Sequence, residues 1–370
     1  MKIKDYLRMD AEREAKLRAI ATFSPKKDMP KLTQNERFSP FDRALIESVL
    51  PAANRMLQGA AAYPSTATVC ISQTCTHNCS GCPSGWERKR ENCFMDPSNF
   101  SKVLHSLRSL EVKFINLSGG GEPTLHPSFC EFAQMCIRQQ FKLSLMTNAV
   151  SLEPTAVQVL VEGFSFLRAN LDASSDEVYN RIHNPPQHDE FRKALVSMER
   201  IVSERQRRKS DLIFGAEVRI CQANTNFLEE ITRLATDLGL DYLQFRIKRE
   251  ASDGLQPDQV EGVRKLIEEL KVNFFPFPVY GENRGRKLNS GCQLAPLTLA
   301  IGPSGDAFPC PRFAGRPEIS AFGNIFSLRP DKLWFGPDHK RAVEQLGRIK
   351  CRIKDCRWRI CGELARCSRR

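Results

Sequence analysis

Short β-rich runs alternate with helix-length amphipathic segments between residues 67 and 250, which we take as the core. This order constrains the fold strongly, because strands separated by helices form βαβ units and a parallel sheet. The predicted strands are Ala67–Gln73, Val112–Ser118, Phe141–Thr147, Phe166–Asp172, Leu212–Ile220 and Tyr242–Ile247. The predicted helices lie near residues 98–110, 127–139, 154–163, 190–206, 226–238 and 257–270. The count fits an α/β fold, a partial (β/α)6 barrel, in which chemistry is expected at the C-terminal ends of the strands.

Three further segments surround this core. Residues 1–66 have helix-forming composition around Ala11–Ile20 and Phe41–Gln58, which predicts a helical N-terminal extension. Residues 251–290 hold the last predicted helix and a linker rich in proline, glycine and aromatic residues. Residues 291–370 show few regular elements and six cysteines, which predicts a small irregular Cys-rich domain held by metal.

The chain has fourteen cysteines, and it has no apolar run long enough to span a membrane. Its N-terminus lacks the apolar stretch of a secretory signal, so we expect a cytoplasmic protein. Disulfides are rare in a reducing compartment, and a surplus of thiols there indicates metal binding. Three cysteines lie between residues 75 and 82 and six between 292 and 367, a grouping that scattered core thiols would not produce.

Cys75, Cys79 and Cys82 follow the first predicted strand with the spacing C-x3-C-x2-C. Three thiolates on one short loop can ligate three irons of a cubane cluster and leave the fourth iron without a protein ligand. An open coordination position is typical of a catalytic metal site, whereas a structural zinc site takes four closed ligands. His77 could be proposed as a fourth ligand, but it lies between two of the others, where the geometry is poor. The alternatives are a structural metal knuckle and thiols that bind no metal.

This loop resembles the signature of the radical S-adenosylmethionine (SAM) superfamily, over a domain of residues 67–250. The resemblance implies a 4Fe-4S cluster whose open iron is chelated by the amino and carboxylate groups of SAM. One electron then cleaves SAM to methionine and a 5′-deoxyadenosyl radical, which abstracts hydrogen from the substrate. The resemblance also implies an electron donor such as flavodoxin or ferredoxin. One departure is Gly81, which stands where many members have an aromatic residue.

A glycine-rich turn follows the second predicted strand and contains Gly120, Gly121, Glu122 and Pro123. Glycines let the backbone approach a ligand closely and present free N–H groups. Glu122 supplies an anion that can pair with an ammonium group. The turn resembles the family's Gly-Gly-Glu-Pro motif, which holds the amino group of SAM. Alone, such a run is an ordinary tight turn, but its place one strand and one helix after the cysteine loop favours SAM binding.

The ends of the third and fourth predicted strands are similar to positions that lie near SAM in this family. Thr147 and Asn148 resemble a Thr-Asn-Gly turn in which Ala149 replaces the glycine. Asn170 and Asp172 resemble a Ser-x-Asp strand whose serine often reaches the SAM ribose, with Asn170 at the serine position. The alternative for each residue is a role in solvation or packing. All these motifs fall at strand ends in chain order, which favours one shared site.

Cys292 and Cys310 enclose Gly305, with twelve residues before the glycine and four after it. This spacing resembles the opening of the SPASM and twitch extensions, which bind one or two auxiliary 4Fe-4S clusters. Four more cysteines follow at Cys351, Cys356, Cys361 and Cys367. Their spacing departs from the usual SPASM pattern. We therefore predict one auxiliary cluster, ligated by Cys292, Cys310 and two of the last four cysteines; the alternative is a structural zinc site.

These features predict a radical SAM enzyme, most simply of the oxidoreductase type, that acts on a peptide or on a small natural product or sugar. Oxidation, epimerisation or a related maturation would be the outcome. The net charge is +12, and residues 340–370 carry eleven Lys/Arg against three Asp/Glu. Such a tail can bind nucleic acid or another polyanion. Two alternatives stay open: an RNA-modifying radical SAM enzyme, and a non-enzymatic metal-binding protein that binds nucleic acid. Arg246, on the sixth strand, puts a cation at the predicted barrel mouth.

Overall fold

The computed structural model describes residues 48–49, 52, 62–79, 82, 93–150, 152–247, 254–270, 274–276, 297–315 and 318–348. Most of the predicted N-terminal helical extension therefore lies outside the described residues. Five of the predicted metal ligands also lie outside them, namely Cys292, Cys351, Cys356, Cys361 and Cys367.

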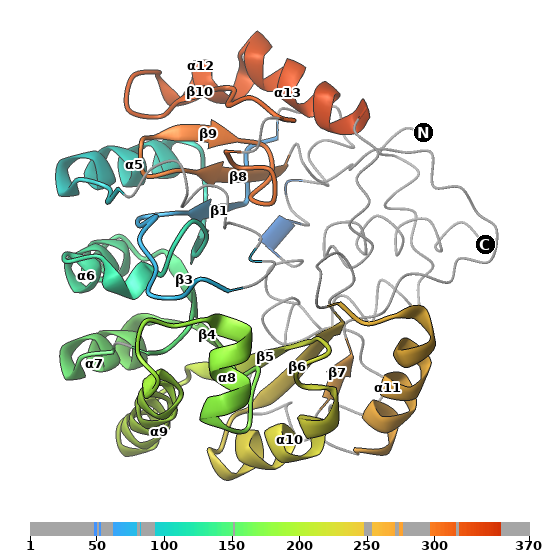
Figure 1. Cartoon of the computed structure of the whole chain (residues 1–370). Helices are drawn as coiled ribbons and strands as arrows, with labels where there is room; N and C mark the ends of the chain where they lie inside the picture. The colour runs from blue at the N-terminus through green and yellow to red at the C-terminus, as the bar shows by residue number, and fades with distance from the viewer. Residues whose placement is uncertain are drawn as a thin grey trace, which may run out of the picture.

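The described strands form one open sheet in the order β10-β9-β8-β1-β2-β3-β4-β5-β6-β7 (Figure 1). The strands are β1 (Thr66–Val69), β2 (Phe114–Leu117), β3 (Lys142–Thr147), β4 (Phe166–Asn170), β5 (Ile213–Ile220), β6 (Tyr242–Ile247), β7 (Phe274–Pro276), β8 (Thr298–Ile301), β9 (Asp306–Phe308) and β10 (Gly323–Asn324). All neighbours from β8 across to β7 pair in parallel, and β9 pairs antiparallel with β8 and with β10. The end strands do not pair with each other, so the predicted partial barrel is confirmed as an open parallel sheet.

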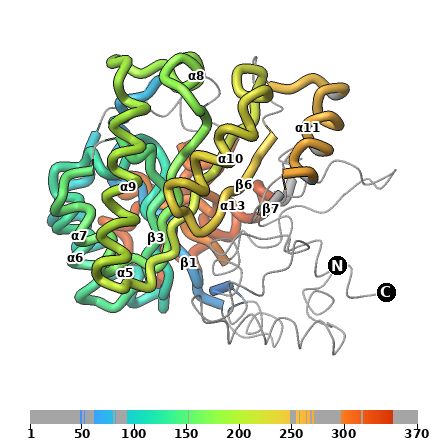
Figure 2. The backbone as a smooth tube through the Cα atoms, turned by 90° about the horizontal axis from the view of Figure 1, so that it is seen from below, coloured from blue at the N-terminus to red at the C-terminus, as the bar shows by residue number. Residues whose placement is uncertain are grey.

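The helices gather along one side of this sheet, as Figures 1 and 2 show for α5, α6, α7 and α9. Their bounds are α5 (Pro97–Ser109), η3 (Pro123–Leu125), α6 (Phe129–Arg138), α7 (Pro154–Gly163), α8 (Asp176–His183), α9 (Glu190–Arg208), η4 (Thr225–Phe227), α10 (Leu228–Asp237), α11 (Pro257–Glu269), α12 (Pro330–Phe335) and α13 (Pro337–Arg348). The local sequence determines where several of these helices begin. Before α5, for example, the Asp96 carboxylate accepts a hydrogen bond from Ser98 N–H at 2.8 Å, and Pro97 stands at the first helical position. Every described helix is too short or too polar to cross a lipid bilayer.

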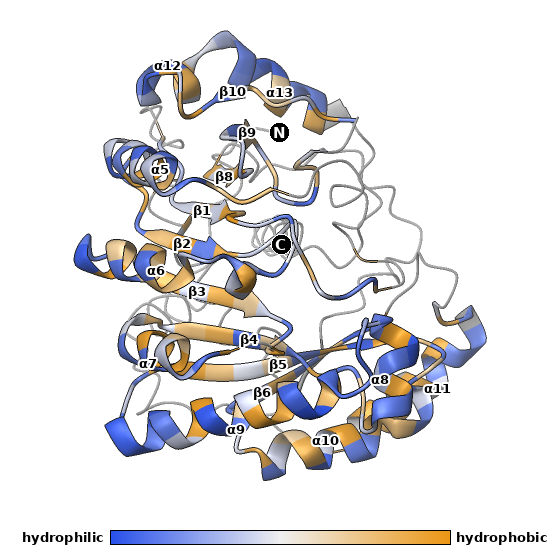
Figure 3. Ribbon diagram, turned by 60° about the vertical axis from the view of Figure 1, so that its left-hand side comes forward, coloured by the Kyte–Doolittle hydropathy of each residue, from blue (hydrophilic) through white to orange (hydrophobic). Residues whose placement is uncertain are grey.

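Alternate residues of the central strands divide the sheet into two faces. On the outer face, apolar side chains pack against the helices in one core; they include Val69, Leu117, Leu145, Leu167, Ala169, Val218 and Phe245. Burying a leucine of this kind contributes about 2 kcal/mol. On the inner face the side chains are mostly polar, and they include Asn116, Ser144, Arg168, Glu217, Gln244 and Arg246. Figure 3 shows that hydrophilic and hydrophobic residues alternate along the helices, whereas the strands are largely hydrophobic or neutral.

The six predicted strands and six predicted helices are confirmed, with ends that shift by a few residues. The prediction missed α8, a helix of eight residues, and it interpreted the residues of β7 as the start of a linker. It also expected few regular elements after residue 291, where β8, β9, β10, α12 and α13 are found. These strands have two to four residues each, too few for a period-2 pattern to be visible. Because β8 pairs with β1 in the same sheet, the domain boundary near residue 291 stays a prediction.

Candidate functional site

The cysteine loop leaves β1 at the C-terminal edge of the sheet. Cys75, Cys79 and Cys82 are half-buried, and none of the three forms a disulfide. Cys82 N–H donates to the Cys79 carbonyl at 3.3 Å, so these two cysteines lie close together. The three predicted ligands therefore lie on one short segment at the end of a strand, where a βα fold places its chemistry.

The glycine turn after β2 packs its backbone directly on the cysteine loop. Gly121 N–H donates to the Ser72 carbonyl and Glu122 N–H to the Thr74 carbonyl, each at 2.8 Å. A Cβ atom added at Gly121 would lie 2.0 Å from the Thr74 carbonyl oxygen, far inside van der Waals contact. Gly120 has a φ of +60°, in the left-handed region that favours glycine. The glycines thus allow the two loops to pack closely against each other. The sequence had suggested instead that they allow the backbone to approach a ligand.

Glu122 is the buried anion of this site, with only 4% of its surface exposed. Its Oε1 accepts hydrogen bonds from the Thr147 hydroxyl at 2.7 Å and from the Thr124 hydroxyl at 2.8 Å. Its Oε2 accepts one from Asn148 N–H at 2.7 Å. Burial raises the pKa of Glu122, against the effect of the hydrogen bonds from Asn148, Thr147 and Thr124. A carboxylate oxygen can accept two hydrogen bonds, so an ammonium group at Oε2 would stabilise the ionised form.

The turn after β3 holds Glu122 in place. Thr147 and Asn148, both predicted near SAM, are nearly buried and donate to the Glu122 carboxylate. Ala149 has a φ of +61°, which explains why a glycine is the usual residue at this position of the motif. The Thr147 hydroxyl also accepts a hydrogen bond from Ala149 N–H at 2.9 Å. These hydrogen bonds to Glu122 were not predicted from the sequence.

Asp172 connects the end of β4 to β5 and to α8. Its Oδ1 accepts a hydrogen bond from Arg219 N–H at 2.5 Å, and its Oδ2 lies 3.3 Å from His183 Nε2. Asp172 is 2% exposed, whereas Asn170 is half-buried and lies opposite Glu217 in the register of β4 and β5. Both predicted residues therefore border the same edge of the sheet as the cysteine loop.

Two histidines hold the cysteine loop against α8 and α9: His77, considered above as a fourth ligand, and His183, which was not predicted. His183 Nδ1 lies 3.1 Å from the Cys79 sulfur, and the His183 carbonyl accepts a hydrogen bond from Asn78 N–H at 3.0 Å. Burial opposes protonation of His183, but Asp172 and Cys79 outweigh it and raise its pKa to about 9. His77 Nε2 lies 2.8 Å from Glu190 Oε2.

The donor atoms of His77, Cys79 and His183 lie within 4.8 Å of one another, so this corner of the site is rich in metal-binding groups. The contact of His183 with Cys79 could not be predicted from the sequence, because it depends on α8, the helix that the prediction missed. His77, for its part, is engaged by Glu190 and by the Tyr179 hydroxyl, which lies 3.1 Å from its Nε2.

The inner face carries a cluster of charges below this edge. Glu217 on β5 is 2% exposed, and its Oε2 lies 2.9 Å from Arg168 Nη1. Arg246 Nη1 lies 3.4 Å from both oxygens of Glu217, and Arg219 Nε lies 3.6 Å from Oε1. The cation that the sequence placed at the barrel mouth, Arg246, is therefore one of three guanidinium groups around a single carboxylate.

The donor set of the cysteine loop fits an iron–sulfur cluster. Three soft thiols come from one segment, and none of them is spent on a disulfide. Arg219 lies close enough to Cys82 for the two charges to interact, so a cation borders the cysteine loop. The buried Glu122 carboxylate lies on the adjoining loop, ready for a cationic group.

Only Cys310 of the predicted auxiliary-cluster ligands lies among the described residues, and it is 9% exposed. It follows β9 directly, so the spacing around Gly305 corresponds to the β8–β9 hairpin. Gly305 has a φ of +87°, and a Cβ atom there would lie 2.5 Å from the Phe326 ring. The predicted motif therefore spans a real hairpin, while its ligands stay a prediction.

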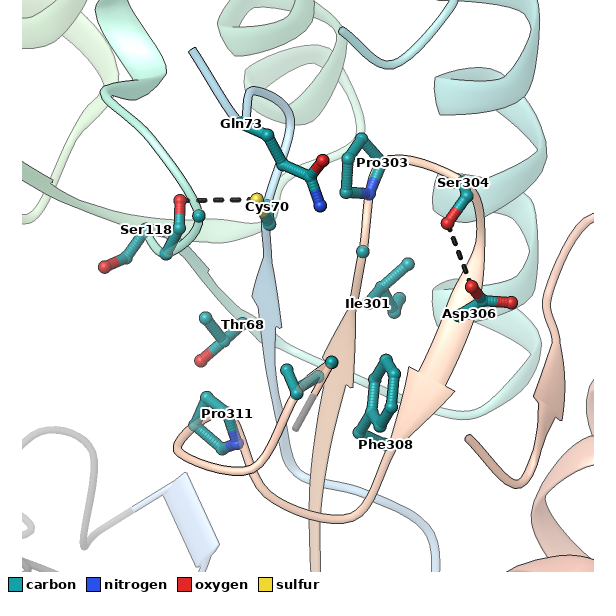
Figure 4. Close-up of a pocket in the computed structure, with 16 residues that line it drawn as sticks. Thr68, Cys70, Gln73, Ser118, Ile301, Pro303, Ser304, Asp306, Phe308 and Pro311 are labelled. Atoms are coloured by element: carbon teal, nitrogen blue, oxygen red, sulfur yellow. Dashed lines mark hydrogen bonds between the residues drawn. The ribbon is translucent and has the colours of Figure 1, made fainter. Parts of the chain in front are cut away.

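A cavity of about 190 Å³ lies between this hairpin and the glycine turn (Figure 4). Gln73 and Cys70 line it from the cysteine-loop side, and Ser304 and Asp306 line it from the hairpin. Asp306 accepts a hydrogen bond from the Ser304 hydroxyl at 3.0 Å. Phe308 and Pro311 also line this cavity, so the loop that follows Cys310 borders it.

Residues 69–215 match the family described as the Radical SAM superfamily. The mycofactocin maturase MftC of Mycobacterium tuberculosis is 24% identical over 279 residues, covering 70% of this chain and 66% of that protein. The chain thus spans just under two thirds of the length of this curated relative. A tungsten-containing aldehyde ferredoxin oxidoreductase cofactor-modifying protein of Pyrococcus furiosus is 25% identical over 213 residues, or 56% of each chain.

Solved structures share the fold. SuiB of Streptococcus suis, bound to its precursor peptide SuiA, superposes with a TM-score of 0.59 at 13% identity, covering 89% of this chain and 77% of that chain. The anSMEcpe structure with bound AdoMet gives a TM-score of 0.59 at 16% identity, covering 79% and 88%. At these identities the likeness concerns the arrangement of helices and strands.

Proposed function

Because residues 69–215 carry a radical SAM domain, we propose that this protein is an enzyme that cleaves SAM and uses the resulting radical to modify a peptide or a peptide-derived natural product. The main support for the proposal is the contact between the cysteine loop and the glycine turn at the C-terminal edge of the sheet. The cysteine loop supplies three thiols, and the glycine turn lays a buried carboxylate beside them through two backbone hydrogen bonds.

Cys75, Cys79 and Cys82 would hold a 4Fe-4S cluster with one open iron. When bound, the cluster supplies the single electron that breaks a carbon–sulfur bond of SAM, giving methionine and a 5′-deoxyadenosyl radical. That radical takes a hydrogen atom from the substrate and becomes 5′-deoxyadenosine. An electron donor such as flavodoxin or ferredoxin would supply the electron in the cell.

The residues around Glu122 would orient SAM. The Glu122 carboxylate, fixed by Thr147 and Asn148, would accept hydrogen bonds from the ammonium group of SAM. Gly120, Gly121 and Pro123 set the position of that carboxylate by shaping its turn. Asn170 and Asp172, at the end of the next strand, would face the ribose. Burial raises the pKa of Glu122, so the ammonium would also favour its ionised form.

A peptide substrate is supported by the relatives, since MftC is named as a maturase and SuiB is solved with a precursor peptide. Oxidation of the substrate is the outcome we propose. It would need a place for the electron left on the substrate radical, and an auxiliary cluster would accept it. Cys310, next to the cavity beside the glycine turn, would ligate that cluster together with Cys292 and two of Cys351, Cys356, Cys361 and Cys367.

The experiment is SAM cleavage by the full chain, reconstituted anaerobically with iron and sulfide and reduced with dithionite. We expect 5′-deoxyadenosine and methionine in equal amounts. Cys79→Ser should abolish both products, whereas Cys130→Ser, a half-buried thiol on the distant helix α6, should retain them. Glu122→Gln should weaken SAM binding at least about tenfold, since a charge-assisted hydrogen bond is lost. Reconstituted protein that binds iron but yields no 5′-deoxyadenosine would contradict the proposal.

A further inference from the structure

Two arginines face each other on the inner side of the sheet, near its C-terminal edge. Arg219 on β5 and Arg246 on β6 are register partners in neighbouring parallel strands. Neighbouring strands lie about 4.8 Å apart, so the two side chains start from adjacent positions on the same face. Like charges placed opposite each other on a sheet are destabilising. An anion between the two guanidinium groups would remove that repulsion.

The charge of Asp172 also acts on Arg219, but the carboxylate that contacts all three guanidinium groups is that of Glu217. Its short contact is to Arg168, at 2.9 Å. Its contacts to Arg246 and Arg219, at 3.4 and 3.6 Å, are longer than an ordinary N–H···O hydrogen bond. Glu217 thus pairs primarily with Arg168 and holds the other two arginines more loosely.

Exposure increases along the cluster towards the strand ends. The side chain of Arg168 is 6% exposed, that of Arg246 is 19% exposed and that of Arg219 is 32% exposed. Arg168 and Glu217 therefore form the buried floor, and Arg219 and Arg246 form the part that a ligand can reach. The Arg219 backbone N–H donates to Asp172, and Asp172 contacts His183, whose Nδ1 lies 3.1 Å from the Cys79 sulfur. Arg219 therefore lies on the side of the cysteine loop.

We propose that Arg219 and Arg246 bind a carboxylate group of the substrate, such as the C-terminal carboxylate of a peptide. Two planar guanidinium groups on adjacent strands can each donate two N–H groups to one carboxylate. A carboxylate held there lies next to the edge of the sheet that carries the cysteine loop, which presents the substrate backbone to the radical. This inference rests on the proposed function and names the chemical group by which that substrate is recognised.

A carboxylate at this position has two possible sources, the substrate and the methionine part of SAM. The charge cluster recognises the chemistry that both share, and competition separates them. If the site serves the substrate, saturating SAM leaves the affinity for a second carboxylate within about threefold. If SAM itself occupies the arginines, the two compete, and the assignment to the substrate is overturned.

The test uses the reconstituted full chain and two probes, N-acetylglycine and N-acetylglycinamide, which differ only in the charge of the terminal group. Calorimetry or saturation-transfer NMR should show the acid binding at least about tenfold more tightly than the amide, because only the acid accepts charge-assisted hydrogen bonds. Arg246→Gln and Arg219→Gln should each remove most of this preference. Arg233→Gln, on the exposed side of α10, removes the same charge elsewhere and should preserve it.

Equal binding of the acid and the amide by the unaltered protein would overturn the inference, whatever the variants do. An acid preference that survives both Arg246→Gln and Arg219→Gln would overturn it as well. SAM cleavage is measured on the same samples. If the protein cleaves SAM but shows no preference for the acid, only the proposed carboxylate site is contradicted. If it prefers the acid but does not cleave SAM, the carboxylate site is supported and the proposed function is contradicted.

Discussion

The two faces of the sheet are formed by the same strands but are stabilised in different ways. On the outer face, Leu145, Leu167 and Val218 pack against helices and need no polar partner. On the inner face, Arg168, Glu217 and Gln244 are also buried, and each has a charged or hydrogen-bonding partner on another strand of the sheet. Burial on the outer face is driven by apolar area, whereas burial on the inner face depends on pairing.

This contrast separates stability from function along each strand. Because successive side chains of a strand point to opposite faces, one residue can serve the core while the next serves the site. Val218 and Arg219 are such a pair, and so are Phe245 and Arg246. At the C-terminal edge of the sheet, the contact between the cysteine loop and the glycine turn sets the geometry of the site.

The largest effect is expected where the two loops touch. Gly121→Ala puts a Cβ atom 2.0 Å from the Thr74 carbonyl oxygen, so the glycine turn must move away from the cysteine loop. A misplacement of about 1 Å costs on the order of 100-fold in rate, and we expect SAM cleavage to fall by that factor. Gly262→Ala is the matched control, because the new methyl group on α11 meets nothing within 4 Å. It should raise stability by about 0.5 kcal/mol and leave cleavage intact. Similar losses in both variants would contradict the role of the loop contact.

The next effect tests the inner face. Glu217→Gln leaves three guanidinium groups without their shared carboxylate, and breaking a buried ion pair of this kind costs about 4 kcal/mol. Urea unfolding measures the loss. Glu177→Gln breaks an exposed pair with Arg181 and should cost less than about 1 kcal/mol. If the two variants were equally stable, pairing would not be what stabilises the inner face.

The outer face should show a comparable loss of stability with no loss of function. Leu167→Ala removes a fully buried side chain from β4 and should cost about 3 kcal/mol. Well below its melting temperature, the variant should cleave SAM at a rate within about twofold of the unaltered protein, because the deleted atoms face the helices. Val196→Ala, at an exposed position of α9, serves as the control. A large loss of cleavage in Leu167→Ala would mean that the two faces are coupled.

The smallest effect concerns a buried polar group in apolar surroundings. Desolvation by burial against Trp334 and Phe322 lowers the pKa of His339 to about 4, from an ordinary value of 6.5. The unfolded chain therefore binds a proton below pH 6.5 that the folded chain does not bind until about pH 4. Stability is complete above pH 6.5 and falls as the pH drops through this window.

Between pH 7.5 and 5 the expected loss from His339 is about 2 kcal/mol. His339→Phe keeps an aromatic ring and removes the titrating group, so its stability should depend less on pH over this window. The difference in unfolding free energy between the two proteins is the measurement. A difference that does not change with pH would show that His339 titrates normally in the folded chain.

Much of the core could be predicted because its signals are local. The strands β1 to β6 are short β-rich runs separated by helix-length segments, and the cysteine and glycine motifs fall directly after two of them. The helix α8 was not predicted, because its eight residues carry a mixed pattern of apolar and polar residues and are followed closely by Pro185 and Pro186. The short strands after residue 297 escaped because two to four residues show no period.

The charge cluster could be predicted only in part. Arg246 was visible as a cation near a strand end, since its own strand placed it there. The pairing of Arg168 with Glu217 depends on the relative register of β4 and β5, which no local pattern encodes. The approach of His183 to Cys79 joins residues 104 positions apart through α8, so it too required the folded chain.

The central claim is that Cys75, Cys79 and Cys82 hold a cluster, and iron content tests it most directly. Iron is counted after anaerobic reconstitution of the full chain and of a variant with all three cysteines replaced by alanine. The account predicts that the variant loses about four irons per chain and all SAM cleavage, while Cys130→Ala, on α6, keeps both. A variant that retains its full iron content, or that still produces 5′-deoxyadenosine, would contradict the account.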